Sequence, residues 1–265
     1  MSTVDLSTVD LTQRLNGRVT VITGGASGIG LASARRMRAE GATIVIGDID
    51  PKAGGAVADE LGGMFVEVDV SDEAAVDNLF DTAAGTYGSV DIAFNNAGIS
   101  PPDDDLIETT ELPAWQRVQD INLKSVYLCC RAALRHMVPA NRGSIINTAS
   151  FVAVMGSATS QISYTASKGG VLAMSRELGV QFARQGIRVN ALCPGPVNTP
   201  LLQELFAKDP ERAARRLVHI PLGRFAEAEE LAAAVAFLAS DDASFITGST
   251  FLVDGGISSA YVTPL

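Results

Sequence analysis

The sequence predicts a single α/β domain in which a mostly parallel, doubly wound sheet of seven strands carries helices on both faces. Short apolar runs alternate with helical patterns along the chain, and this alternation is typical of parallel sheets. The 265 residues are 47% hydrophobic and 19% charged, enough to bury one large core, and no linker rich in Pro, Ser or Gly divides them. The expected strands are residues 18–23, 43–47, 64–68, 92–95, 144–148, 188–193 and 250–253.

A glycine-rich turn joins the first expected strand to a helical pattern over residues 29–40. The turn, residues 23–30, reads TGGASGIG. Glycine lets a backbone approach a ligand closely, and the N-terminus of the following helix attracts a pyrophosphate. The glycine spacing departs from the G-x-G-x-x-G dinucleotide fingerprint, so the turn alone indicates only a phosphate site.

The second expected strand is followed directly by Asp48, whose carboxylate can accept hydrogen bonds from the ribose hydroxyls of an adenosine. A carboxylate at this point repels the 2'-phosphate of NADP. No compensating cation stands nearby, because Ser27 occupies the turn and Ile49 follows Asp48. The sequence therefore predicts a preference for NAD(H).

The fifth expected strand leads into Ser150 and then to a helix beginning near Ser163. Tyr164 and Lys168 lie four residues apart on that helix and so share one face. A free tyrosine has a pKa of about 10, and a neighbouring ammonium would stabilise its phenolate. We expect Lys168 to lower the pKa of Tyr164, so that Tyr164 can act as an acid or base.

Several separated motifs occur in the order found in one known family. They are residues 23–30, Asp69-Val70, Asn95-Asn96-Ala97-Gly98, Asn122, Ser150, Tyr164 with Lys168, Pro194-Gly195, and Val253-Asp254-Gly255-Gly256. Together they resemble the classical short-chain dehydrogenase/reductases over about residues 16–256. The resemblance implies a Rossmann fold, NAD as cofactor and a secondary alcohol or ketone as substrate.

The resemblance also implies a role for each matching residue. The expected catalytic residues are Asn122, Ser150, Tyr164 and Lys168, and the expected substrate contacts are Ser150, Val152 and Tyr164. The expected cofactor contacts are Gly24, Ser27, Gly28, Ile29, Gly30, Asp48, Ile49, Asp69, Val70, Asn96, Ala97, Gly98, Tyr164, Lys168, Pro194, Gly195, Val197 and Thr199. Substrate selectivity is expected in a loop at about residues 195–224, with help from Val152 and Met155.

Some of these residues have a structural explanation as well. Asp69 could be a turn residue at the end of a strand. The segment from Asn95 to Gly98 both supports the sheet and borders the cofactor, so its role is partly structural.

Three functions remain open from the sequence. The leading one is an NAD(H)-dependent oxidoreductase that interconverts a secondary alcohol and a ketone. The second is a 3-oxoacyl thioester reductase, although such enzymes usually draw on NADPH. The third is a dinucleotide-sensing regulator without turnover, which has no need of Tyr164.

Composition limits the possible partners and compartment. The net charge of −10 argues against nucleic-acid and anionic membrane surfaces. Cys129, Cys130 and Cys193 have no metal-ligand spacing, so we expect reduced thiols, a cytoplasmic protein and no metal site. Residues 1–15 are expected to form a mobile tail or, alternatively, a subunit contact. The family resemblance implies a homotetramer that pairs through helices near residues 113–136 and 164–184.

Overall fold

The structure is a computed structural model that describes residues 13–157, 159–198 and 217–261. Its centre is a seven-stranded sheet in the order β3-β2-β1-β4-β5-β6-β7, and every neighbouring pair of strands is parallel. The strands are β1 (Val19–Thr23), β2 (Thr43–Asp48), β3 (Met64–Glu67), β4 (Ile92–Asn95), β5 (Gly143–Thr148), β6 (Ile187–Pro194) and β7 (Thr250–Val253). Their apolar side chains explain these elements, because β1, β4 and β5 are buried along their whole length.

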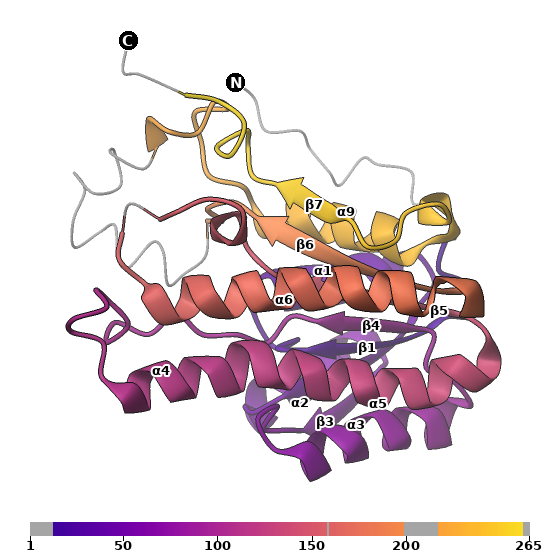
Figure 1. The fold of residues 1–265 in the computed structure, drawn as a ribbon. Coiled ribbons are helices and arrows are strands. Elements are labelled where there is room, and N and C mark those ends of the chain that lie inside the picture. Colours follow the sequence, from indigo (N-terminus) through magenta and orange to yellow (C-terminus); the bar gives the residue numbers. More distant parts are fainter. Residues whose placement is uncertain (1–12, 158, 199–216, 262–265) are drawn as a thin grey trace.

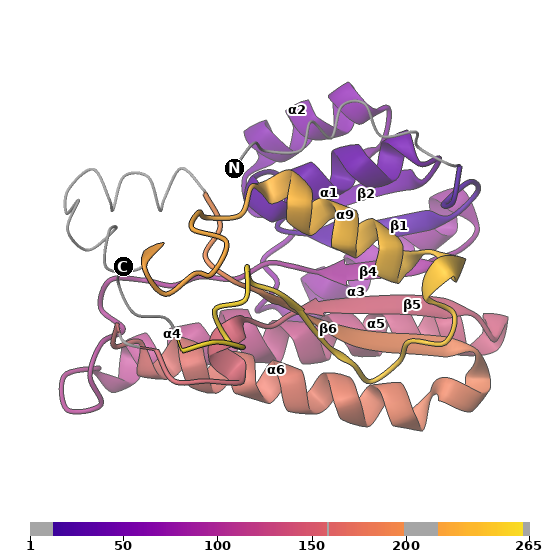
Figure 2. The same ribbon diagram turned by 90° about the horizontal axis from the view of Figure 1, so that it is seen from above.

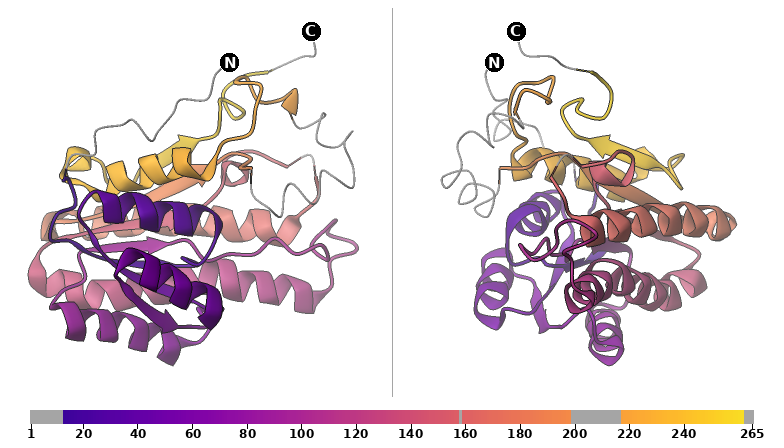
Figure 3. Two further views of the ribbon diagram at one scale, coloured as in Figure 1. Left: turned by 180° about the vertical axis from the view of Figure 1, so that it is seen from behind. Right: turned by 60° about the vertical axis from the view of Figure 1, so that its left-hand side comes forward.

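Helices cover both faces of the sheet, as predicted. The helices are α1 (Gly28–Ala39), α2 (Pro51–Leu61), α3 (Glu73–Tyr87), α4 (Leu112–Gln119), α5 (Ser125–Ala140), α6 (Ile162–Gln181) and α9 (Ala228–Ala239). Figure 1 shows α3, α4, α5 and α6 in front of the sheet, and the view from behind in Figure 3 shows α1, α2 and α9. Each layer has its own hydrophobic core against the sheet.

The two ends of the strands differ in what they carry. Because all neighbouring strands are parallel, their carboxyl ends lie at one edge of the sheet. The view in Figure 2 shows the loops after β1, β4, β5 and β6 at the same side of the molecule. The motifs of the sequence are therefore gathered at one edge by the topology.

One expected helix has an irregular centre. The pattern at residues 113–136 predicts a continuous helix, and the chain is helical from Leu112 to Ala140. Between α4 and α5, however, Asp120–Lys124 forms a π-helical turn. Such turns are rare and frequently lie at functional sites, and this one carries Asn122.

The last residues assigned to the N-terminal tail pack onto the domain. Leu15 is fully buried beside α1 and α9, and Arg14 donates two hydrogen bonds of 2.8 Å to the carboxylate of Glu40. Residues 1–12 lie outside the described residues, so the division at residue 15 stays a prediction. Among the described helices, none combines the length and apolar character needed to cross a bilayer.

Candidate active site

The glycine-rich turn after β1 is a close-packed backbone loop. Gly24 and Gly28 have φ values of +64° and +53°, which glycine adopts without strain. A Cβ atom on Gly30 would collide with the carbonyl oxygen of Gly24. The Asn96 side chain donates hydrogen bonds to the carbonyls of Thr23 and Gly24 at 3.2 and 3.1 Å, so the loop after β4 fixes the turn.

The N-terminus of α1 has the features of an anion site. Ser27 precedes the helix and its side chain makes no capping hydrogen bond, and no acidic residue stands in the first turn. A Cβ atom on Gly28 would meet nothing within 4 Å, so the space beside the turn is open. Free N–H groups and the helix dipole attract negative charge. The residues present therefore fit the pyrophosphate of a dinucleotide.

Asp48 is bound to the same turn through its carboxylate. One oxygen accepts a hydrogen bond from the N–H of Ala26 at 3.0 Å and the other from Asp50 at 3.2 Å. Ile49 is 67% exposed beside it. The geometry brings Asp48 to the phosphate turn, as a ribose-binding carboxylate requires.

Within the described part of the chain, the hydrogen bonds of the Asp69 carboxylate are local. The carboxylate accepts hydrogen bonds from the N–H and the hydroxyl of Ser71 at 2.9 and 2.7 Å. These contacts are those of a turn residue at the end of a strand, the structural explanation given above for Asp69. Val70 is buried. Contact of these two residues with the adenine stays a prediction.

Tyr164 and Lys168 face one another on α6. The Lys168 ammonium lies 5.6 Å from the centre of the Tyr164 ring and donates a hydrogen bond of 2.7 Å to the carbonyl of Thr148, at the end of β5. Lys168 is only 2% exposed. The i and i+4 spacing thus produces a buried ammonium beside the phenol.

Burial shifts the pKa of both groups. It lowers the pKa of Lys168 to about 8 and raises the pKa of Tyr164, which a hydrogen bond with Ser150 opposes. In the chain by itself the pKa of Tyr164 is raised, because desolvation of the phenolate outweighs the other effects, and the expected lowering by Lys168 stays a prediction. Tyr164 stays a protonated phenol near neutrality.

Ser150 and Asn122 complete the cluster. Ser150 is 4% exposed, follows β5 and lies near enough to the Tyr164 phenol to oppose the rise of its pKa. Asn122 is fully buried, and its amide accepts from the N–H of Ile99 and donates to the carbonyl of Ile99, both at 2.8 Å. This pairing explains why a poor helix former stands inside the helix.

Gly98 shows that Asn122 and Lys168 meet at one point. A Cβ atom on Gly98 would lie 3.3 Å from the Asn122 side-chain oxygen and 3.4 Å from the Lys168 ammonium. The loop after β4 therefore touches both residues through a glycine. The structure brings together all four expected catalytic residues, whose roles stay predictions.

The turn after β6 is explained in part by packing. Gly195 donates to the carbonyl of Val253 at 2.9 Å, and a Cβ atom on it would lie 2.6 Å from the Cα of Asp254. Val197 is buried and pairs with Ala226. Thr199 and most of the expected substrate loop lie outside the described residues.

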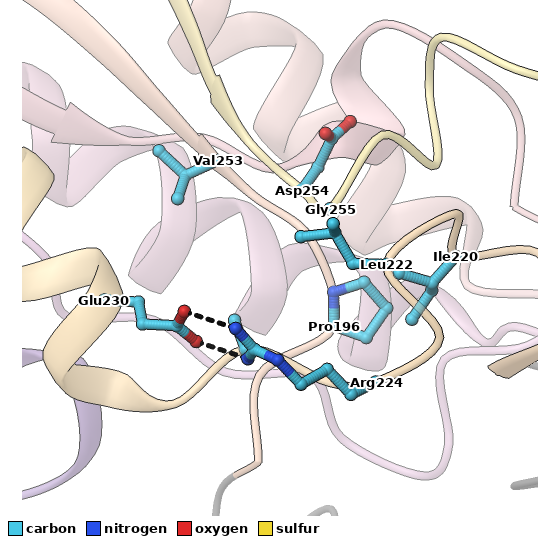
Figure 4. Close-up of a pocket in the computed structure, with 9 residues that line it drawn as sticks. Pro196, Ile220, Leu222, Arg224, Glu230, Val253, Asp254 and Gly255 are labelled. Atoms are coloured by element: carbon cyan, nitrogen blue, oxygen red, sulfur yellow. Dashed lines mark hydrogen bonds and ion pairs between the residues drawn. The ribbon is translucent and has the colours of Figure 1, made fainter. Parts of the chain in front are cut away.

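A cavity of about 70 Å³ lies beyond this turn, next to α9. Figure 4 shows Pro196, Ile220 and Leu222 around it, with Arg224 directed at Glu230. The guanidinium of Arg224 makes two hydrogen bonds of 2.7 Å to that carboxylate. The cavity is too small for a substrate. The ion pair fixes Arg224, at the end of the expected substrate loop, to α9.

The two residues expected to form an apolar substrate wall, Val152 and Met155, differ in exposure. Val152 is 2% exposed, whereas Met155 is 39% exposed. Within the described residues, no group of three or more His, Cys, Asp and Glu side chains could hold a metal ion. Substrate contact by Val152 stays a prediction.

Comparisons with known proteins point to one family. A family model described as enoyl-(acyl carrier protein) reductase matches residues 24–258. The cis-4-hydroxycyclohexanecarboxylate dehydrogenase of Sinomonas cyclohexanicum is 46% identical over 244 residues, which are 90% of this chain and 96% of that protein. The 3-oxoacyl-(acyl-carrier-protein) reductase of Thermotoga maritima is 37% identical over 249 residues, covering 92% and 99%. The crystal structure of levodione reductase has a TM-score of 0.88 at 35% identity, covering 94% and 100%.

The chain therefore belongs to the classical short-chain dehydrogenase/reductase family, which confirms the resemblance read from its motifs. The fold is the predicted Rossmann type. The protein is an oxidoreductase of a family that generally uses NAD or NADP.

Proposed function

We propose that the protein is an NAD(H)-dependent oxidoreductase that interconverts a secondary alcohol and a ketone, with Tyr164 as the acid/base. The observation that carries the proposal is the cluster of Tyr164, Lys168 and Ser150. A buried ammonium lies 5.6 Å from the centre of the phenol ring, and Ser150 lies near enough to the phenol to oppose the rise of its pKa. A protein that only sensed dinucleotides would have no need of this arrangement.

Each member of the cluster has a separate task in this proposal. A bound nicotinamide would supply the hydride chemistry, with the hydride passing between its ring and the alcohol carbon. Tyr164 gives its phenol proton to the carbonyl oxygen in reduction, and its raised pKa keeps that proton in place at neutral pH. Ser150 donates a hydrogen bond to the same oxygen and holds it beside the phenol.

Lys168 and Asn122 assist Tyr164 without contacting the substrate oxygen. The ammonium stabilises negative charge on Tyr164 as the proton leaves and hydrogen-bonds the nicotinamide ribose. Asn122 orients a water that leads from Lys168 to solvent. Support comes from Gly98, which lies against both side chains.

Asp48 supports the choice of NAD(H). Its carboxylate is fixed at the phosphate turn by the N–H of Ala26, where it would repel a 2'-phosphate. Two unit charges 4 Å apart repel by about 4 kcal/mol at an effective dielectric constant of about 20, and half of that is roughly a thirtyfold preference.

The decisive experiment is Tyr164→Phe, which removes only the phenolic hydroxyl. Turnover should fall by about 100-fold or more, while NADH binding, followed by its fluorescence, should stay within about threefold of the wild-type value. A Tyr164→Phe protein with near-normal turnover would show that the acid/base is another group. Both cofactors and a panel of cyclic alcohols and ketones should be used.

A second candidate is a 3-oxoacyl thioester reductase. The 37% identical reductase of Thermotoga maritima and the description of the family model favour it. Faster turnover of oxoacyl thioesters with NADPH than of alcohols or ketones with NAD(H) would support the thioester reductase. The charge of Asp48 favours the NAD(H)-dependent oxidoreductase instead.

We also propose a homotetramer in the cytoplasm. Tyr127 on α5 and Val180 on α6 are 51% and 78% exposed, on the two helices through which family members pair. Burial of these side chains between subunits would remove apolar surface from water. Light scattering at micromolar concentration tests the assembly, and a monomer would contradict it.

A further inference from the structure

The segment that joins β4 to α4 is attached to two of the expected catalytic residues. At its start, the backbone of Ile99 makes both hydrogen bonds with the amide of Asn122. Five residues later, Asp104 reaches the beginning of α6, the helix of Tyr164. One loop therefore connects the π-helical turn with the acid/base.

Asp104 caps α6 from outside the helix. One carboxylate oxygen accepts from the N–H of Ser163 and the other from the N–H of Tyr164 itself, both at 2.8 Å. The carbonyl of Asp105 accepts from Ile162 at 3.2 Å. Three successive N–H groups of the first turn are thus bound by two residues of the loop.

The helix supplies no cap of its own. The side chain of Gln161, which precedes α6, makes no capping hydrogen bond, and no acidic residue stands in its first turn. The first N–H groups of a helix need acceptors, and a carboxylate also interacts favourably with the dipole there. Asp104 meets both needs, and it is only 6% exposed.

A second contact holds the same turn from the other side. The amide of Gln119, the last residue of α4, donates a hydrogen bond of 3.0 Å to the carbonyl of Ser163. The peptide unit before Tyr164 is therefore held at its N–H by the loop and at its carbonyl by α4. The Cα of Tyr164 has little freedom to move.

We propose that Asp104 is a positioning residue that sets the place of the Tyr164 phenol relative to Ser150 and Lys168. This inference rests on the proposed role of Tyr164 as acid/base. A displacement of about 1 Å at a reacting group can cost about 100-fold in rate. A carboxylate suits the position because it offers two acceptors for two neighbouring N–H groups.

The test is Asp104→Asn, which changes one acceptor oxygen into an NH₂ group that faces a backbone N–H. Loss of the second acceptor should shift the first turn of α6. We expect kcat to fall by about 10- to 100-fold. The KM for the cofactor and NADH binding should stay within about threefold, because the glycine-rich turn and Asp48 are untouched.

Glu108→Gln is the matched control, since it makes the same carboxylate-to-amide change at an exposed position of the same loop. It should keep wild-type kcat. Asp104→Ser, which retains one acceptor common at helix N-termini, should recover part of the lost rate and serves where Asp104→Asn does not fold.

Two results would overturn the proposal. One is a kcat for Asp104→Asn within twofold of the Glu108→Gln value or, where Asp104→Asn does not fold, a kcat for Asp104→Ser within twofold of that value. The other is an equal loss of kcat and cofactor binding in step with a lower melting temperature, which is the pattern of a purely structural cap. Tyr164→Phe, measured in parallel, separates the proposals: full activity of that variant removes the proposed function, whereas an inactive Tyr164→Phe with an unaffected Asp104→Asn removes only this one.

Discussion

The half of the sheet built on β1 and β2 and the half built on β4, β5 and β6 present different chemistry at their carboxyl ends. The first half offers backbone: glycines with positive φ, the uncapped start of α1, and an Asp48 carboxylate bound to the turn. The second half offers buried polar side chains, Asn122, Ser150 and Lys168, of which none is more than 4% exposed.

This difference predicts different responses to substitution. A surface made of backbone tolerates many side chains but fails where a Cβ atom enters it. A surface made of buried polar groups carries a cost in stability, because a charge removed from water is disfavoured. In the first half, adding a Cβ atom to a glycine should therefore disrupt the turn. In the second half, replacing a buried polar group should raise the free energy of unfolding while it removes activity.

The largest effect is expected from Gly30→Ala. Its Cβ atom would meet the Gly24 carbonyl and lie 2.8 Å from the Asn96 amide nitrogen, so the turn must move. We expect cofactor affinity to fall by about 100-fold or more, or the domain to lose several kcal/mol of stability. Fluorescence titration with NADH and denaturant unfolding measure the two outcomes.

Gly55→Ala is the control for that change. Gly55 lies in α2, and a Cβ atom there would meet nothing within 4 Å. Alanine should raise the free energy of unfolding by roughly 0.5–1 kcal/mol at this helical position. Similar behaviour of the two variants would contradict the idea that the turn is a close-packed cradle.

The sequence predicted the first half of the site better than the second. Glycines and strand-end carboxylates have local causes, so the turn at residues 23–30 and Asp48 could be found from their spacing. The π-helical turn around Asn122 depends on the pairing with Ile99, a contact 23 positions away in the chain. Asp104 stands among three successive aspartates, and only the fold shows which one reaches α6. The direction of the Tyr164 pKa shift depended on burial, which the sequence does not supply.

An intermediate effect is expected from Asp48→Ala. Wild-type protein should favour NAD(H) over NADP(H) in kcat/KM by roughly thirtyfold, from the repulsion between the carboxylate and the 2'-phosphate. The variant should lose most of this preference, and added salt should weaken it in the wild type. Equal use of both cofactors by the wild type would show that Asp48 does not contact the ribose.

The smallest change in free energy, and the sharpest test of the comparison, is expected in the stability of Lys168→Met. Methionine keeps much of the length of the side chain without its charge, so turnover should be lost. The folded protein should nevertheless become more stable at pH 7, by roughly 1–2 kcal/mol. Burial of the ammonium is the largest cause of the lowered pKa of Lys168, about 8, although the ammonium donates a hydrogen bond to the Thr148 carbonyl.

The pH dependence of this gain follows from the same shift. Below pH 8 the lysine is charged in both the folded and unfolded chain, so the full cost of burial is present and the variant has its greatest advantage. As pH rises from about 8 toward the ordinary value of 10.5, the folded chain gives up its proton first and the advantage shrinks. Urea unfolding at pH 7 and pH 10 measures both ends. Lys124→Met, at a half-exposed lysine paired with Asp120, should change stability by less than about 1 kcal/mol at either pH. A Lys168→Met protein that is less stable than the wild type at pH 7 would mean that the catalytic half is held together by its lysine rather than strained by it.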